Sequence, residues 1–288
     1  MSNARNLANL LGTSTKANQV ISTSGAITTT GAFTSVGIDD NADATAMTID
    51  SAENIGIGTT PESHHANWTA IDFGDQGFLG HYDGGDTVIA TNAYYDGAWK
   101  AKETGVSTLY SQLGISGHLF RVGASASADA SITLSEAMRI NANGYVTKPL
   151  QPVLSLYGDT VRVQAGGQNS DTDVSFTERI DNTNSYDTAN KYFDVPVDGK
   201  YLINFYASVK SNTSYVLIKI KVGSTTEALS YGEEPNASVD WVARSCQTIL
   251  DLSAGDAVRF QLTGGSSTAS NIQILENKYR GVHMFLLA

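Results

Sequence analysis

Apolar residues recur at every second position along the stretch from residue 201 to residue 210, and most of the positions between them are polar. The first set of positions holds Tyr201, Ile203, Phe205, Ala207 and Val209, and the positions between them hold Leu202, Asn204, Tyr206, Ser208 and Lys210. A period of two residues predicts a β-strand with one buried face. Asp198-Gly199 precedes this stretch and predicts a turn, because glycine reaches backbone conformations that other residues avoid.

The same alternation recurs at 215–222, where Val216, Ile218, Ile220 and Val222 alternate with Tyr215, Leu217, Lys219 and Lys221. It predicts a half-buried strand with the lysines along its outer edge. Shorter apolar runs at 153–156, 161–163, 174–180, 257–262 and 272–275 bring the C-terminal half to about eight strands, the number that a jelly roll requires.

Residues 62–136 contain short apolar runs separated by turn residues, beginning at Trp68 and including Asp96-Gly97 inside an aromatic stretch. Turn signals about every 8–12 residues predict a β-sandwich or a small barrel. An internal repeat flanks this region, because Ala46–Ile55 aligns without gaps on Ala137–Val146. Both copies predict a small hairpin, and we expect the two hairpins to close the body between them.

The N-terminal segment has a different pattern. Residues 2–12 predict a short helix with Ser2 as its cap, Leu7, Leu10 and Leu11 at helical spacing, and Gly12 as its stop. Residues 13–45 are rich in Ser, Thr, Ala and Gly, with isolated apolar residues that one chain buries poorly. We therefore predict an attachment segment at 1–45, a β-rich knob at 46–148 and a β-rich head at 149–288.

Composition and charge narrow the function classes. The chain has 288 residues, of which 41% are hydrophobic and only 16% charged, and its net charge is −11. No Lys/Arg cluster accompanies that charge, which disfavours nucleic-acid binding. No signal peptide is visible, and no apolar run approaches the roughly 18 residues of a membrane span, so we expect no membrane insertion. The single cysteine, Cys246, predicts a small buried residue rather than a reactive thiol.

Three ordered motifs in the C-terminal half resemble a known family. They are Phe193-x-x-Pro196-x-x-Gly199-x-Tyr201, Leu250-x-Leu252-x-x-Gly255-Asp256-x-Val258, and Tyr279-Arg280-Gly281 running into Phe285-Leu286-Leu287. Together they resemble the jelly-roll heads of complement subcomponents and tumour necrosis factor. The third departs from the family pattern, since Val282, His283 and Met284 separate the glycine from the aromatic residue. The resemblance implies an all-β chain with a trimeric jelly-roll head.

The repeated hairpin, followed in its first copy by Gly56-Ile57-Gly58-Thr59-Thr60-Pro61, resembles the shaft and collar motif of bacteriophage tail fibres. This resemblance implies an elongated homotrimer, assembled in the host cytoplasm and located in the virion. Its N-terminus, through Leu7, Leu10 and Leu11, would attach to a tail, collar or baseplate adaptor. The C-terminal head would recognise a bacterial surface glycan or an outer-membrane receptor.

Aromatic residues among polar groups identify the candidate receptor site. The tract from 231 to 241 contains Tyr231, Glu233, Glu234, Asn236 and Trp241. Flat rings beside acids and amides suit sugars, whose apolar faces pack on aromatic rings. Trp241 could instead anchor a strand end in the core. The loop Asn182–Tyr186 is a second candidate.

The remaining chemistry favours no enzyme. His64, His65 and Glu62 are close in sequence, but adjacent strand residues point to opposite faces, so a metal site is disfavoured. Carboxylates cluster at 233–234 with Asp240, at 171 and 173, and at 178 and 181, which leaves a glycan hydrolase open. We predict no catalytic residue, metal or cofactor. The alternatives are a structural collar or baseplate fibre without receptor binding and, more remotely, a cytokine-like ligand.

Overall fold

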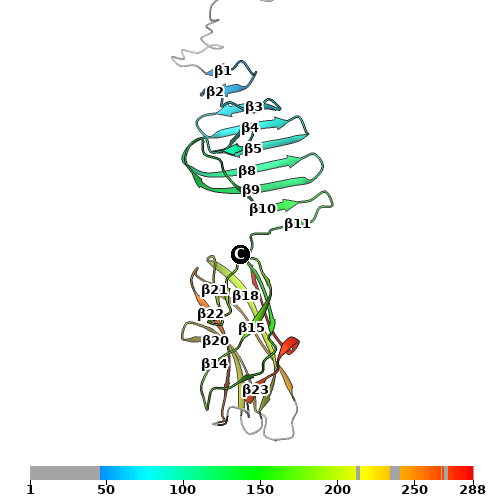
Figure 1. The fold of residues 1–288 in the computed structure, drawn as a ribbon, viewed down its shortest axis with the longest axis vertical. Coiled ribbons are helices and arrows are strands. Elements are labelled where there is room, and N and C mark those ends of the chain that lie inside the picture. The colour runs from blue at the N-terminus through cyan, green and yellow to red at the C-terminus, as the bar shows by residue number, and fades with distance from the viewer. Residues whose placement is uncertain (1–45, 212–214, 234–240, 267, 269–271, 288) are drawn as a thin grey trace, which may run out of the picture. The chain divides into compact units, whose positions relative to one another are not determined.

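A computed structural model describes residues 46–211, 215–233, 241–266, 268 and 272–287. The described residues are all-β, as predicted, and their only helical element is the single 3-10 turn η2 (Asn277–Tyr279). Figure 1 shows two strand-rich bodies, described separately below: the meander sheet (residues 47–147) and the jelly roll (residues 153–286). The predicted helix at 2–12 and the Ser/Thr-rich segment lie outside the described residues.

The meander sheet is one open sheet of nine strands. In spatial order they are β1 (Met47–Ile49), β2 (Ile55–Ile57), β3 (Trp68–Phe73), β4 (Gly77–Tyr82), β5 (Asp86–Thr91), β8 (Gly105–Leu113), β9 (Gly117–Ala126), β10 (Leu134–Ile140) and β11 (Val146–Thr147). The prediction of a sandwich or barrel is therefore wrong. Spatial order follows sequence order except that β6 and β7 lie outside this sheet, so β5 pairs with β8 and no second large sheet faces the nine strands.

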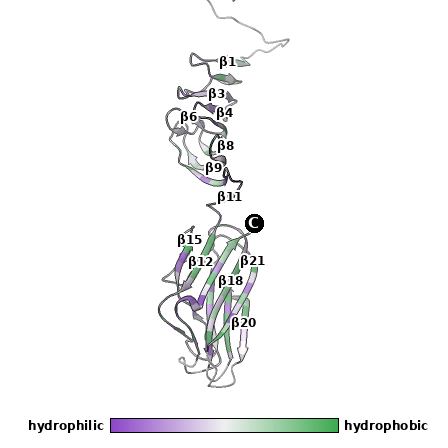
Figure 2. Ribbon diagram, turned by 90° about the vertical axis from the view of Figure 1, so that its right-hand side faces the viewer, coloured by the Kyte–Doolittle hydropathy of each residue, from purple (hydrophilic) through white to green (hydrophobic). Residues whose placement is uncertain are grey.

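One face of the meander sheet is covered by its own connections. β6 (Tyr94–Tyr95) and β7 (Trp99–Lys100) form a separate hairpin, and in Figure 2 the chain around β6 lies on one side of the sheet. The rings of Trp68, Phe78 and Trp99 contact one another, with the Trp68 centroid 5.8 Å from Phe78 and 5.7 Å from Trp99. The buried residues of this small core are Ala70, Phe78, Val88, Ala90, Ala93 and Leu109.

The sequence repeat forms two equivalent hairpins, which occupy the two edges of the sheet. Asp50 Oδ1 accepts hydrogen bonds from the backbone N–H groups of Ala52 and Asn54 at 2.8 and 2.9 Å. Asn141 Oδ1 accepts the corresponding bonds from Asn143 and Tyr145, both at 3.0 Å. The left-handed position of the turn is Glu53 in the first copy and Gly144 in the second. Both hairpins are confirmed, at the edges of an open sheet.

The jelly roll consists of two sheets. The first contains β13 (Val163–Gln164), β23 (Ile272–Ile274), β18 (Gly199–Ser211), β24 (Arg280–Leu286), β12 (Val153–Gly158) and β15 (Phe176–Asp181), with β21 (Val242–Leu252) also paired to β18. The second contains β16 (Tyr186–Asp187), β17 (Tyr192–Asp194), β22 (Ala257–Gly264), β19 (Tyr215–Val222) and β20 (Thr225–Glu233), with β14 (Thr172–Asp173) paired to β22. β19 lies between β22 and β20, so its lysines are on a sheet face rather than on an edge, as a correction to the prediction.

The jelly-roll core follows the alternation in the sequence. Tyr201, Ile203, Phe205, Ala207 and Val209 of β18 are each at most 2% exposed, as predicted. Phe205 meets Phe260 of the opposite sheet with ring centroids 5.6 Å apart. Apolar side chains between two sheets leave water together, which is the main driving force of folding.

Arg280 is the largest fully buried side chain in the described residues. Its guanidinium donates to the carbonyl oxygens of Ser175, Val161 and Leu275 at 3.1, 2.9 and 3.0 Å and pairs with Asp159. Burial lowers its pKa, whereas the Asp159 carboxylate acts in the opposite direction. The next residue, Gly281, leaves room for the Tyr206 hydroxyl, because a Cβ atom at this position would lie only 2.4 Å from that oxygen. The motif Tyr279-Arg280-Gly281 thus serves packing.

Candidate ligand-binding surface

The strands of the jelly roll run between two ends. Val153, Leu202 and Phe285 pair at one end, where the chain enters from residue 152. Tyr215 pairs with Glu233, and Val209 with Val242, at the opposite end. We call the end at Tyr215 and Val209 the far end, and the predicted receptor tract begins there.

An aromatic pair stands at the far end on the outer face of the second sheet. The rings of Tyr215 and Tyr231 stack with centroids 5.8 Å apart and planes inclined by 22°. Tyr231 is 51% exposed, so a large part of the pair faces water. The Tyr215 hydroxyl donates a hydrogen bond to Asn169 Oδ1, which holds that ring in place. An exposed, fixed aromatic platform fits the predicted sugar-stacking surface.

Charged groups continue this outer face beside the aromatic pair. Asp171 accepts hydrogen bonds from Lys219 Nζ at 2.7 Å, Lys221 Nζ at 3.0 Å and the Thr263 hydroxyl. Burial opposes the ionised form of Asp171, but these donors prevail and hold its pKa well below the usual range. Asp171 stays a carboxylate at neutral pH, and the lysine heads are oriented by it.

A second set of paired charges lies further along the same face. Arg259 donates to Asp173 Oδ2 at 2.7 Å and to the Asn190 carbonyl oxygen at 2.8 Å. Its guanidinium carbon lies 4.9 Å from the centre of the Tyr192 ring. Cations and carboxylates therefore alternate between the two aromatic positions, Tyr215–Tyr231 and Tyr192. Such a face donates and accepts hydrogen bonds without a large local charge, which suits a polyhydroxylated ligand.

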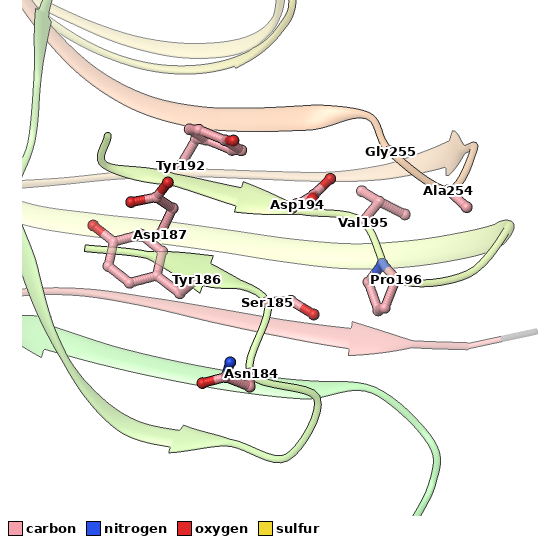
Figure 3. Close-up of a pocket in the computed structure, with 10 residues that line it drawn as sticks. All are labelled: Asn184, Ser185, Tyr186, Asp187, Tyr192, Asp194, Val195, Pro196, Ala254 and Gly255. Atoms are coloured by element: carbon pink, nitrogen blue, oxygen red, sulfur yellow. The ribbon is translucent and has the colours of Figure 1, made fainter. Parts of the chain in front are cut away.

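A shallow pocket of about 490 Å³ lies at the end where the chain enters. Figure 3 shows its residues, with Tyr186, Asp187 and Tyr192 at one side and Val195, Pro196, Ala254 and Gly255 at the other; Asn184, Ser185 and Asp194 complete the lining. Hydrogen bonds from the backbone and side chain of Asn190 lower the pKa of Asp187, which leaves it ionised. The predicted loop 182–186 therefore contributes to a pocket.

The predicted receptor residues are only partly described. Tyr231 lies on β20, and Glu233 is the last residue of that strand. Trp241 precedes β21 and is half-buried, with Arg162 stacked 5.3 Å from its ring centre. Glu234 and Asn236, and Leu7, Leu10 and Leu11 of the attachment segment, lie outside the described residues.

Sequence reasoning did not identify Tyr215, Asn169, Tyr192 or Arg259 as candidate site residues. Tyr215 was visible as an outward member of the alternating stretch at 215–222, but its diagonal position beside Tyr231, which pairs with Leu217 on the neighbouring strand, was not. Asn169 and Arg259 carried no signal, because their proximity to the aromatic rings arises from strand pairing across the sheet.

The histidines and the cysteine that the sequence analysis considered as reactive residues make contacts that stabilise the fold. The side chains of His64 and His65 lie in different surroundings. His64 is buried, with its Nε2 2.8 Å from an Asp72 carboxylate oxygen, whereas His65 is exposed. Lys102 Nζ lies 3.1 Å from the same carboxylate. Burial opposes ionisation of Asp72, but hydrogen bonds from His64 and the Glu62 backbone, with Lys102 nearby, lower its pKa. Cys246 is buried as predicted, and burial raises its pKa to about 12.

Within the described ranges, no group of three His, Cys, Asp or Glu residues is arranged to hold a metal ion. The same part of the chain has no helix of the length and apolarity that crossing a membrane requires.

Comparison with known proteins supports the jelly-roll assignment. Residues 160–280 match the family model of the C1q domain. Residues 160–280 are therefore similar to C1q domains, a non-enzymatic recognition and structural fold that is commonly trimeric and ligand-binding. The resemblance to complement heads is confirmed for this half.

One similar solved structure is the globular domain of a zebrafish complement 1qA protein. It is 18% identical, it covers 48% of this chain and 98% of its own, and the TM-score is 0.37. No curated protein sequence matches the chain.

Proposed function

We propose that this protein is a homotrimeric bacteriophage tail fibre whose jelly roll recognises a glycan on the bacterial surface. The carrying observation is the exposed Tyr215–Tyr231 stack on a C1q domain, at the end opposite the entry of the chain. The paired charges beside it supply hydrogen-bond donors and acceptors for sugar hydroxyls. The fibre assignment draws on the hairpin repeat and its resemblance to fibre shafts, and it makes the virion the expected location.

The outer face of the first jelly-roll sheet supports a trimer. Val153, Phe285, Leu202 and Ile249 form one cross-strand row, of which Phe285 is 42% and Ile249 59% exposed. Apolar rows of this kind on a monomer mark protein contacts. Three copies would present three identical aromatic pairs, and three weak sites on one rigid tip gain about 10²–10⁴ in avidity.

Binding of the full-length protein to host cells and to a glycan array tests the proposal. Tyr231→Ala should reduce binding at least about tenfold, since stacking on one ring contributes on the order of 1 kcal/mol per site and three sites act together. Tyr279→Ala is the matched control, because Tyr279 is 48% exposed in the same domain. Equal binding by both variants and the unmodified protein would remove the aromatic pair from the site.

A separate variant, Tyr192→Ala, tests whether the pocket binds the glycan. A larger loss with Tyr192→Ala than with Tyr231→Ala would move the glycan site to the pocket. Complete absence of binding by the intact protein, together with its presence in particles, would favour the second candidate function, a structural fibre, collar or baseplate component. The repeated hairpin is compatible with that candidate as well, because a fibre shaft needs no receptor site.

Attachment is tested on particles. Replacing Leu7, Leu10 and Leu11 together by Asp should abolish incorporation through the proposed adaptor contact while leaving the solution mass unchanged. Normal incorporation of that triple variant would contradict N-terminal attachment.

A further inference from the structure

The meander sheet has an open face with an apolar row that crosses its strands. Register places these residues side by side on successive strands from β2 to β9: Ile55, Ile71, Leu79, Ile89, Tyr110 and Phe120. The row continues to Ile49 at one edge and to Met138 toward the other. Strands about 4.8 Å apart extend such a row over roughly 35 Å.

These side chains stand in water in the single chain. Ile49 is 62% exposed, Ile89 50%, Leu79 37% and Phe120 36%. Full burial of a side chain of this size is worth about 1.5–3 kcal/mol. Monomeric proteins rarely leave a continuous row of this extent uncovered, so the face marks a contact surface.

The open face also lacks charge. The charged residues within the nine described strands are Asp72, Asp86, Arg121, Glu136 and Arg139, and all lie on the opposite, covered face. Glu136 and Arg139 form an ion pair at 2.6 Å there. The residues that flank the apolar row are neutral, such as Thr87, Thr108 and Gln112. An uncharged face repels no copy of itself, and it offers nothing to attract an oppositely charged partner.

We propose that this open face packs against the same face of the other two copies of the chain, forming a second trimer contact independent of the jelly roll. The inference rests on the trimer of the proposed function. A trimeric C1q domain holds three meander sheets on short tethers, at an effective concentration of about a millimolar, where even a weak apolar contact closes. The row has one member on each strand from β1 to β10 in the sheet, so neighbouring copies can pack along its whole length.

Thiol labelling of the full-length protein tests this contact. Native Cys246 is buried and has a raised pKa, so it reacts slowly and leaves a low background. Ile89→Cys places a thiol in the middle of the row, and Phe120→Cys gives a second position. Asp75→Cys, in an exposed turn of the same sheet, is the control. We expect maleimide labelling at both row positions to be at least about tenfold slower than at the control position.

A photo-activated cross-linker on the Ile89→Cys thiol then identifies the occupant. The expected product has twice the mass of one chain, and its captured peptide comes from residues 47–147. Capture of a peptide from residues 1–45 would assign the face to that segment and overturn the proposal.

The mass in solution separates this inference from the proposed function. A trimer whose row thiols label as fast as the control would overturn the sheet contact and leave the trimeric head standing. A monomer would overturn both.

Discussion

The jelly roll and the meander sheet solve the burial of apolar strand faces in different ways. In the jelly roll two sheets face each other, and 26 buried residues of the described part of the chain form one cluster between them. In the meander sheet short connections cover one face with a cluster of six buried residues, and the other face keeps an exposed apolar row. The difference indicates that the jelly roll can fold on its own core, whereas the meander sheet would bury its second face only in the proposed trimer.

Arg280→Ala should have the largest effect on the jelly roll. Removing the guanidinium leaves the carbonyl oxygens of Val161, Ser175 and Leu275 and the Asp159 carboxylate without their donor. Loss of one partner from a buried ionic cluster costs about 3–5 kcal/mol. Chemical denaturation measures the free energy of unfolding, and Arg259→Ala on the outer face is the control, with an expected loss of about 1 kcal/mol or less. Similar losses in the two variants would contradict the role of Arg280.

Phe78→Ala should destabilise the meander sheet by about 3 kcal/mol, because it removes a fully buried ring between Trp68 and Trp99. Chemical denaturation measures this loss.

Phe120→Ala tests the open face of the same sheet. Its cost should be small at concentrations where the protein is monomeric and should grow as the trimer forms. A cost independent of protein concentration would speak against burial of that face between copies.

Acid should weaken the outer face of the second sheet through Asp171. The folded-state pKa of Asp171 is depressed, so its contribution to stability is present above the unfolded value of about 3.9 and is lost as pH falls below it. Urea denaturation between about pH 6 and pH 3 should show this loss, reduced in Asp171→Asn. An unchanged slope in the variant would exclude Asp171 as its source.

The smallest effect concerns the repeated hairpins. Asn141→Ala removes the side-chain acceptor for the backbone N–H groups of Asn143 and Tyr145 and should cost about 1 kcal/mol. Asp50→Ala should cost at least as much at the other edge, since Asp50 accepts the two equivalent backbone bonds and a third from the Asn54 side chain. Thermal denaturation compares both with Asn143→Ala, whose position in the same turn makes it the control. A loss in one hairpin alone would break the equivalence of the repeat.

Alternation in the sequence predicted the strands and the buried faces, because a period of two is set by the local geometry of a strand. The motif at 193–201 predicted the jelly roll, and the repeat predicted both hairpins. Alternation did not predict whether a second sheet exists. Turn signals every 8–12 residues led to the prediction of a sandwich or barrel, yet the described chain supplies nothing to cover the apolar side chains of Ile89 and Phe120.

The candidate site was predicted only where it coincides with a local pattern. Tyr231 was visible within an aromatic and polar tract. Its contact with Tyr215 depends on the register of β19 and β20, and the contact of Asn169 with Tyr215 depends on the path of a loop that no periodicity describes. The local sequence thus indicates which residue types a surface contains, whereas strand register decides which of those residues lie close together.

The mass of the full-length protein in solution, measured by multi-angle light scattering across a dilution series, tests the central claim most directly. The account predicts three times the 30.5 kDa of one chain, with the row thiols of the meander sheet protected at the same concentrations. A stable species of 30.5 kDa at all concentrations would contradict it.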